Sequence, residues 1–300
     1  MEKDIFGKIV DAVYIDRPQE GIKTDFGKAL LIGGSKAYPG AMALAASFAS
    51  LSGCGYVGLA IPDTIYDATF SRIPSTVINE CIANDEESFQ TSWQLVERLS
   101  GYSAILFGNG IKNSAGNRKF LQDLLCAYQG ILVIDATGLR MLADDSSRML
   151  RERNNKIQIV LTPHLGEAQA LFGIGDLGTD PANYENDAVE YARQYDVRIL
   201  LKSHRSILVS KESIHLADQV PTAALGKAGS GDALAGYMTG LLSYAAPALG
   251  IDRTILFADS MIHQAARKAS ESLSSGLASI LSVPQAITAI IHERMKKRGL

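Results

Sequence analysis

Short apolar runs alternate with longer helical patterns along almost the whole chain. The strand-like apolar runs lie at residues 29–32, 56–61, 104–107, 131–134, 157–161 and 198–201, and a hairpin is expected at 207–209 and 214–216. The helical patterns lie at residues 39–52, 116–128, 181–195, 232–244, 253–272 and 284–297. Strands that are almost continuously Ile, Leu and Val are typical of a parallel sheet with both faces covered. The pattern therefore predicts one three-layer α/β/α domain over residues 1–300, with a mostly parallel central sheet.

Residues 41–62 form an uncharged segment that is long enough to suggest a membrane span. The segment is rich in Gly, Ser and Ala, however, and Gly53 and Gly55 interrupt it. We therefore expect a buried helix of small residues followed by a buried strand, and no membrane partner. The first residues carry mixed charges and lack the apolar stretch of a signal peptide, which favours a cytoplasmic location.

Charge and cysteine content exclude several classes of protein. The net charge is −3, and the only dense basic run, at residues 296–298, is expected to be a solvated helix end, so no nucleic-acid partner is predicted. Cys54, Cys81 and Cys126 are far apart and form no CxxC pair. The sequence thus predicts neither a disulfide framework nor a zinc site.

Four loops that follow predicted strands carry glycines or polar side chains. They are 33–35 with the nearby 38–41, then 108–110, Asp135 and 162–167. Each one alone is compatible with ordinary turn and helix-cap chemistry. Ligands of α/β sheets bind at the carboxyl ends of the strands, so the four together favour a site there.

The strongest chemical signal is the segment Gly-Lys-Ala-Gly-Ser-Gly-Asp at residues 226–232, which runs into the small residues 233–236. Glycines at a helix start expose backbone N–H groups, and the helix dipole there favours an anion such as phosphate. Asp232 could simply cap this helix. Its glycine-rich setting favours instead an anion site with a catalytic carboxylate, which would take the proton from an attacking hydroxyl group.

Other motifs are set aside. Residues 53–58 and 173–178 both match GxGxxG, but the first precedes a strand and the second follows a helix, so neither has the context of a dinucleotide fingerprint. No P-loop pattern occurs, and Ser230 has no GxSxG setting. His164 lies in a Pro-His-x-Gly-Glu turn, where a site role and a structural role are equally compatible with the sequence. No metal-ligand spacing is found at His204, His215, His263 and His292.

Taken together, these motifs resemble the ribokinase-like NAD(P)H-hydrate dehydratases, nucleotide-dependent enzymes that repair damaged nicotinamide cofactors. The resemblance extends from about residue 23 to residue 263. It rests on the order and spacing of the segments at 25–27, 31–35, 39–41, 108–110, 135–136, 162–167, 201–202 and 229–232.

The resemblance implies a substrate, NADHX or NADPHX, in which the dihydronicotinamide ring is hydrated across its C5–C6 double bond. It implies phosphoryl transfer from ADP or ATP to the C6 hydroxyl group, followed by loss of phosphate, with Mg²⁺ as the charge neutraliser and no dedicated metal-binding residues. It also implies a homo-oligomer, a tetramer in the family.

Residue roles carry over position by position. The resemblance implies that Asp232 is the catalytic base. Contacts with the hydrate are implied for Ala41, Gly110, His164 and Asp232. Contacts with the adenine nucleotide are implied for Lys202, Ser203, His204, Arg205, Ser206, Gly229, Ser230 and Gly231. The chain departs from the family in the loop at 135–140, Asp-Ala-Thr-Gly-Leu-Arg in place of the usual Asp-Ala-Asp-Ala-Leu-Asn, and at 227–228, where Lys-Ala replaces Thr-Gly.

Two other functions share the same phosphate site. A ribokinase-like kinase of a small alcohol would release a stable phosphorylated product. A catalytically silent relative would bind nucleotide and turn nothing over.

Overall fold

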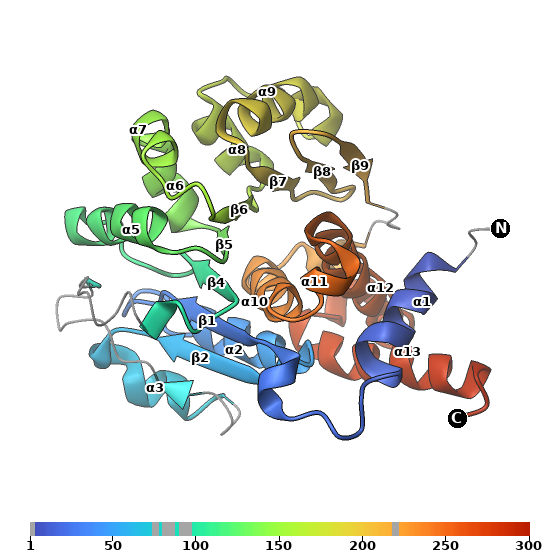
Figure 1. Cartoon of the computed structure of the whole chain (residues 1–300). Helices are drawn as coiled ribbons and strands as arrows, with labels where there is room; N and C mark the ends of the chain where they lie inside the picture. Colours follow the sequence, from blue (N-terminus) through green and yellow to red (C-terminus); the bar gives the residue numbers. More distant parts are fainter. Residues whose placement is uncertain (1–3, 74–77, 80–87, 90–97, 218–221) are drawn as a thin grey trace.

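The computed structural model describes residues 4–73, 78–79, 88–89, 98–217 and 222–300, so Cys81 lies outside the described residues. Within them, nine strands form one sheet in the order β3-β2-β1-β4-β5-β6-β7-β8-β9 (Figure 1). The strands are β1 (Lys28–Ile32), β2 (Tyr56–Ala60), β3 (Ile78–Asn79), β4 (Ala104–Phe107), β5 (Ile131–Ile134), β6 (Gln158–Leu161), β7 (Arg198–Leu201), β8 (Ile207–Val209) and β9 (Ile214–Leu216).

The sheet is parallel from β3 to β7 and antiparallel from β7 to β9. The predicted mostly parallel sheet and the terminal hairpin are thereby confirmed. The uncharged segment at 41–62 folds as the expected helix and strand. No helix in the described ranges is long and apolar enough to cross a membrane.

Helices cover both faces of the sheet, as the prediction of three layers requires (Figure 1). The α-helices of the described residues are α1 (Ile5–Val10), α2 (Ala41–Leu51), α3 (Tyr66–Phe70), α5 (Ala115–Ala127), α6 (Thr137–Ala143), α7 (Ser146–Arg151), α8 (Leu165–Phe172), α9 (Glu185–Tyr195), α10 (Ser230–Leu242), α11 (Ala246–Leu249), α12 (Ile251–Leu277) and α13 (Val283–Lys297). Side chains alternate along each strand, so Leu31 packs towards α2, α10 and α12, whereas Leu30 and Ile32 pack towards α5, α6 and α8.

Several helix boundaries differ from the prediction. Helix α10 begins at Ser230, two residues before the expected start, and α12 extends beyond both expected ends. Helices α6 and α8 were not predicted, because seven or eight residues give too few turns for a clear apolar period. Consequently the polar segment at 162–167 is the start of a helix and not an isolated turn.

The two ends of the described chain meet on one face of the molecule, where α1 lies beside α13 (Figure 1). Arg294 of α13 joins them, since its guanidinium donates to both carboxylate oxygens of Asp11 and to Asp4. This contact belongs to the helical layer that also contains α10.

Helices α2 and α10 pack in close contact because small residues line their interface. A Cβ atom placed on Gly236 would lie 2.1 Å from the backbone oxygen of Ala45. No side chain larger than hydrogen fits between the two backbones without separating the helices. This contact fixes α10 beside the carboxyl end of the sheet.

Gly236→Ala is therefore expected to destabilise the protein by about 1–3 kcal/mol, the usual cost of overpacking, or somewhat more. Urea denaturation would measure the effect. Gly175→Ala is the matched control, because a Cβ atom there meets nothing within 4 Å. Equal stability of the two variants would contradict the close packing of α2 and α10.

Candidate functional site

A buried ion pair lies at the carboxyl edge of the sheet, where β5, β6 and β7 end. Asp135 follows β5 and is 1% exposed. Its Oδ1 atom accepts hydrogen bonds from Lys202 Nζ at 2.6 Å and Thr162 Oγ1 at 2.9 Å, and its Oδ2 atom accepts one from Asn109 Nδ2 at 2.9 Å. The Asp135 carboxylate thus joins its own loop to the loops that carry Asn109, Thr162 and Lys202, which are far apart in the sequence.

Lys202 keeps its positive charge in this buried position. Burial lowers the pKa of the ammonium group, but the negative charges of Asp135, Glu167 and Asp232 outweigh that effect and raise it. Its Nζ atom lies 3.5 Å from the position that a Cβ atom on Gly231 would take, so the charge is at the start of α10.

The start of α10 has the geometry of an anion site. Gly229 precedes the helix with φ +94°, a left-handed conformation that favours glycine, and the helix start has no side-chain cap. Its first N–H groups and the Lys202 ammonium group therefore face the same region, where both favour negative charge. The prediction that the 229–232 segment forms a helix start at the carboxyl edge is confirmed.

Asp232 lies in the first turn of α10, but its carboxylate does not cap the helix. Its Oδ1 atom accepts a hydrogen bond from Asn109 Nδ2 at 2.7 Å. The pKa of Asp232 is raised to about 6, mainly because burial disfavours the charged form. The hydrogen bond from Asn109 and the positive charge of Lys202 lower this pKa, whereas the negative charge of Asp135 raises it further. A carboxylate with a pKa just below neutral is well suited to act as a general base.

A cavity of about 390 Å³ extends from Lys202 and the start of α10 towards α12. That volume lies in the range of small-molecule sites. Of the eight residues predicted to bind nucleotide, Arg205 and Gly229 do not line it; those that do are Lys202, Ser203, His204, Ser206, Ser230 and Gly231. The lining also includes the apolar side chains of Leu225, Leu234 and Ile262, so one cavity offers both polar groups for an anion and apolar surface for a planar base.

Two residues of α12 in this cavity were missed by the sequence interpretation. Asp259 is fully buried and accepts a hydrogen bond from Ser206 Oγ at 3.3 Å, and His263 Nδ1 lies 3.6 Å from its Oδ1 atom. Burial raises the pKa of Asp259 to about 6, partly opposed by His263. The signal was present as an Asp and a His four residues apart on an otherwise apolar helix face.

The residues predicted to contact the hydrate separate into two groups. Ala41 and Gly110 are neighbours, because the Ala41 Cβ atom lies 3.0 Å from the position of a Cβ on Gly110. Ser35 Oγ donates to the Gly110 oxygen at 2.7 Å, and Gly110 adjoins Asn109, whose amide reaches Asp232. Ala41 and Gly110 therefore lie near Asp232 but do not line the 390 Å³ cavity.

His164 belongs to the other group. Its Nδ1 atom accepts the Glu167 backbone N–H at 3.2 Å, and the Glu167 carboxylate accepts the His164 N–H at 3.0 Å, so the pair forms a capping box at the start of α8. His164 also lines the cavity, and its backbone forms a parallel bridge with that of Lys202. His164 therefore has a structural role as the N-cap of α8, and its contact with the hydrate stays a prediction.

The loop after β5 departs from the family pattern and has an unusual backbone. Ala136 adopts φ +51° and ψ −123°, a conformation that costs a non-glycine residue about 1–3 kcal/mol. The turn is closed by the Gly138 backbone N–H, which donates to the backbone oxygen of Asp135 at 3.0 Å. The strain therefore lies next to Asp135, the acceptor that joins the four loops.

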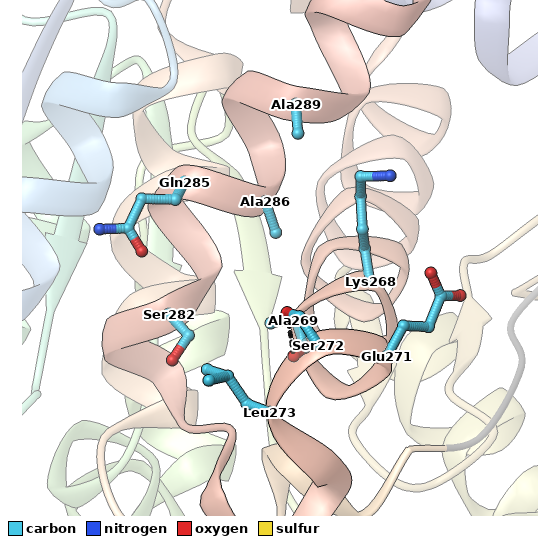
Figure 2. A pocket seen from close by; sticks show the side chains of 9 residues that line it. All are labelled: Lys268, Ala269, Glu271, Ser272, Leu273, Ser282, Gln285, Ala286 and Ala289. Carbon is cyan, nitrogen blue, oxygen red and sulfur yellow. Dashed lines mark hydrogen bonds between the residues drawn. The ribbon is translucent and has the colours of Figure 1, made fainter.

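A second cavity, of about 410 Å³, lies between α12 and α13 and contains none of the predicted site residues (Figure 2). Lys268 and Glu271 project from α12, and Ala286 and Ala289 face them from α13. The Lys268 ammonium group is paired with Glu293 at 2.6 Å. No cluster of three or more potential metal ligands occurs among His, Cys, Asp and Glu in the part of the chain that the structure describes.

Comparison with known proteins gives a consistent result. A family model described as NAD(P)H-hydrate dehydratase matches residues 29–290. The bifunctional NAD(P)H-hydrate repair enzyme of Salinibacter ruber is 31% identical over 76% of this chain, which spans only 42% of that relative. The ADP-dependent (S)-NAD(P)H-hydrate dehydratase of Lactiplantibacillus plantarum is 28% identical over 79% of each chain.

The fold is also that of a solved structure. The ADP/ATP-dependent NAD(P)H-hydrate dehydratase of Bacillus subtilis, crystallised with ATP and Mg²⁺, superposes with a TM-score of 0.71. The match covers 96% of this chain and 97% of the other at 21% sequence identity, and it shows a shared fold.

The raised pKa of Asp232 predicts that this residue destabilises the folded protein at neutral pH. Below pH 3.8 the carboxyl group is protonated in both states and has no effect. The penalty grows between pH 3.8 and about 6 and is complete above that, where it reaches roughly 2–3 kcal/mol.

Asp232→Asn should therefore be more stable than the parent protein at pH 7 and about equally stable at pH 4. Thermal melts of both proteins at the two pH values would test this. A stability difference that does not change with pH would contradict the buried-carboxylate interpretation.

Proposed function

The chain belongs to the NAD(P)H-hydrate dehydratase family, and we propose that it converts NADHX and NADPHX to NADH and NADPH with an adenine nucleotide as phosphoryl donor. One observation carries the proposal: the partly buried carboxylate of Asp232 lies in the first turn of a helix whose uncapped, glycine-rich start has the geometry of an anion site. A base and an anion site in direct contact are what phosphoryl transfer to a hydroxyl group requires.

The first step follows from this geometry. The C6 hydroxyl oxygen of the hydrate attacks the terminal phosphorus of the nucleotide, the bond to the leaving phosphate oxygen breaks, and Asp232 accepts the hydroxyl proton. The N–H groups at residues 229–231 and the Lys202 ammonium group stabilise the charge on the transferring group. AMP leaves when ADP is the donor.

The second step needs little from the protein. The lone pair of the ring nitrogen expels phosphate from C6, and water then accepts a proton from C5, which restores the double bond. Phosphate is a far better leaving group than hydroxide, which is why phosphorylation precedes elimination. Ala41 and Gly110 are proposed to contact the hydrate beside Asp232, and His164 to contact it from the cavity side.

The nucleotide is proposed to occupy the 390 Å³ cavity, with its phosphates at Lys202 and Gly231 and its base against the apolar side chains. The names of the relatives support ADP or ATP as the donor. Mg²⁺ accompanies such nucleotides and takes its ligands chiefly from phosphate oxygens and water, so a donor set without a clustered protein site fits it. When bound, it neutralises phosphate charge.

Further properties belong to the same proposal. We place the protein in the cytoplasm as one domain over residues 1–300, acting as a homo-oligomer (a tetramer by resemblance to the family) and without a nucleic-acid partner. The single continuous sheet supports the domain assignment, and the net charge of −3 supports the lack of affinity for nucleic acid.

Nucleotide binding is expected to raise the melting temperature by mass action, with a shift that grows with ADP or ATP concentration relative to Kd. The loss of this shift in Lys202→Ala, whose ammonium group faces the phosphate site, would locate the nucleotide. Lys211→Ala, an exposed lysine on the turn between β8 and β9, is the control. The absence of any shift at millimolar nucleotide would contradict the proposed donor.

Replacement of the proposed base tests the reaction itself. Asp232→Asn keeps the size of the side chain and should lower the dehydration rate by about 10²–10⁴-fold, the usual contribution of a general base. The return of dihydronicotinamide absorbance from NADHX with ADP or ATP measures the rate. Asp180→Asn makes the same change at an exposed helix start and should leave the rate unchanged.

A folded Asp232→Asn protein within about threefold of the parent rate, far above what loss of a general base allows, would contradict the base assignment. Accumulation of a phosphorylated hydrate without free phosphate would instead identify a kinase. A protein that shows the nucleotide shift but no turnover would be a silent relative.

A further inference from the structure

The side-chain amide of Asn109 lies between two carboxylates, the buried Asp135 and the partly buried Asp232. Its Nδ2 atom donates one hydrogen bond to Asp135 Oδ2 at 2.9 Å and one to Asp232 Oδ1 at 2.7 Å. The residue is 1% exposed, so no bulk solvent competes for these bonds. An amide nitrogen carries two protons, and both are used here.

Only one orientation of this amide is electrostatically acceptable. The flipped orientation would place Oδ1 against two carboxylates, acceptor against acceptor. In the observed orientation Oδ1 is buried and has no hydrogen-bond partner among the described residues. An unsatisfied buried oxygen is costly and uncommon in proteins, which indicates that the contacts of Nδ2 decide where the side chain lies.

Asp135 anchors the amide. Its other oxygen is already held by Lys202 and Thr162, so this carboxylate is a fixed, charged acceptor. Among the described residues, Asn109 Nδ2 is the side-chain donor to the Asp232 carboxylate. A continuous path therefore runs from the phosphate-facing Lys202 through Asp135 and Asn109 to Asp232.

We propose that Asn109 is a positioning residue that holds the Asp232 carboxylate, through Asp135 and Lys202, in the orientation in which it accepts the hydroxyl proton. The inference rests on the proposed function of Asp232 as the base. It assigns a role to a side chain that touches neither the hydrate nor the nucleotide in the proposed mechanism.

The hydrogen bond from Asn109 also favours the charged form of Asp232, the form that accepts a proton. Burial raises the pKa of Asp232, and the hydrogen bond from Asn109 lowers it. The charged groups that face Asp232 are Asp135, which raises its pKa, and Lys202, which lowers it. Helix α2, packed against α10, carries no charged residue, and α12 contributes Asp259 and His263 to the neighbouring cavity. Loss of the Asn109 donor should therefore shift Asp232 towards its protonated form.

Asn109→Ala tests the inference with two measurements. The acidic limb of the pH profile of kcat should move up by about one pH unit, as expected when a carboxylate loses a hydrogen bond, while the KM for nucleotide changes little. NMR titration of the carbon-13-labelled Asp232 carboxyl group should show the same upward shift of its midpoint without any need for turnover.

Asn117→Ala is the matched control. Asn117 is another buried asparagine with side-chain hydrogen bonds, to the Phe89 N–H and the Lys112 oxygen, but it lies on α5 away from Asp232. Its replacement should lower the melting temperature and leave the pH profile in place. Asn109→Gln keeps the amide donors and should therefore shift the Asp232 midpoint less than Asn109→Ala does. If Asn109→Ala does not fold, Asn109→Gln is the variant to measure.

An Asp232 midpoint that is unchanged in the Asn109 variants would overturn the inference. A parent protein that turns over no hydrate would overturn the proposed function instead. Because the NMR titration does not depend on activity, the two failures are distinguishable.

Discussion

Desolvation of charge at the carboxyl edge of the sheet is the constraint on which the rest of the site depends. Asp135 and Lys202 share this buried position because each is the ion-pair partner of the other and further hydrogen bonds satisfy the carboxylate. Asp232 is only partly buried and lacks a direct cation, and desolvation raises its pKa to about 6. One environment thus gives two carboxylates different properties, a fixed anion and a proton acceptor.

The fold supplies this environment through helix packing. Gly236 lets α10 approach the backbone of α2, and α10 also packs on β1, β4 and β5, with Asp232 of its first turn at the Asn109 amide that follows β4. The turn then brings the anion site and Asp232 to the same edge of the sheet. The cavity on the β7 side combines the Lys202 ammonium group with the apolar side chains of Leu225, Leu234 and Ile262, which suits the nucleotide of the proposed reaction.

The sequence was sufficient for the parallel sheet and for the glycine-rich helix start at 229–232, because both depend on local patterns: apolar runs of strand length and glycines before a helix. It could not predict the contact between Asn109 and Asp232, which are 123 residues apart and meet only when the strand ends converge. The Asp259–His263 pair was missed because its meaning depends on the burial of that face of α12. Helix α8 was missed because it is short, so His164 was interpreted without its capping role.

The fate of the C6 hydroxyl oxygen tests the central claim most directly. NADHX carrying oxygen-18 in that hydroxyl group would be incubated with the protein, Mg²⁺ and ADP or ATP, and the released phosphate analysed by mass spectrometry. The account predicts one labelled oxygen in each phosphate molecule, since the hydroxyl oxygen is phosphorylated before it leaves the ring. Label found in water, with unlabelled phosphate, would contradict phosphoryl transfer to the hydrate.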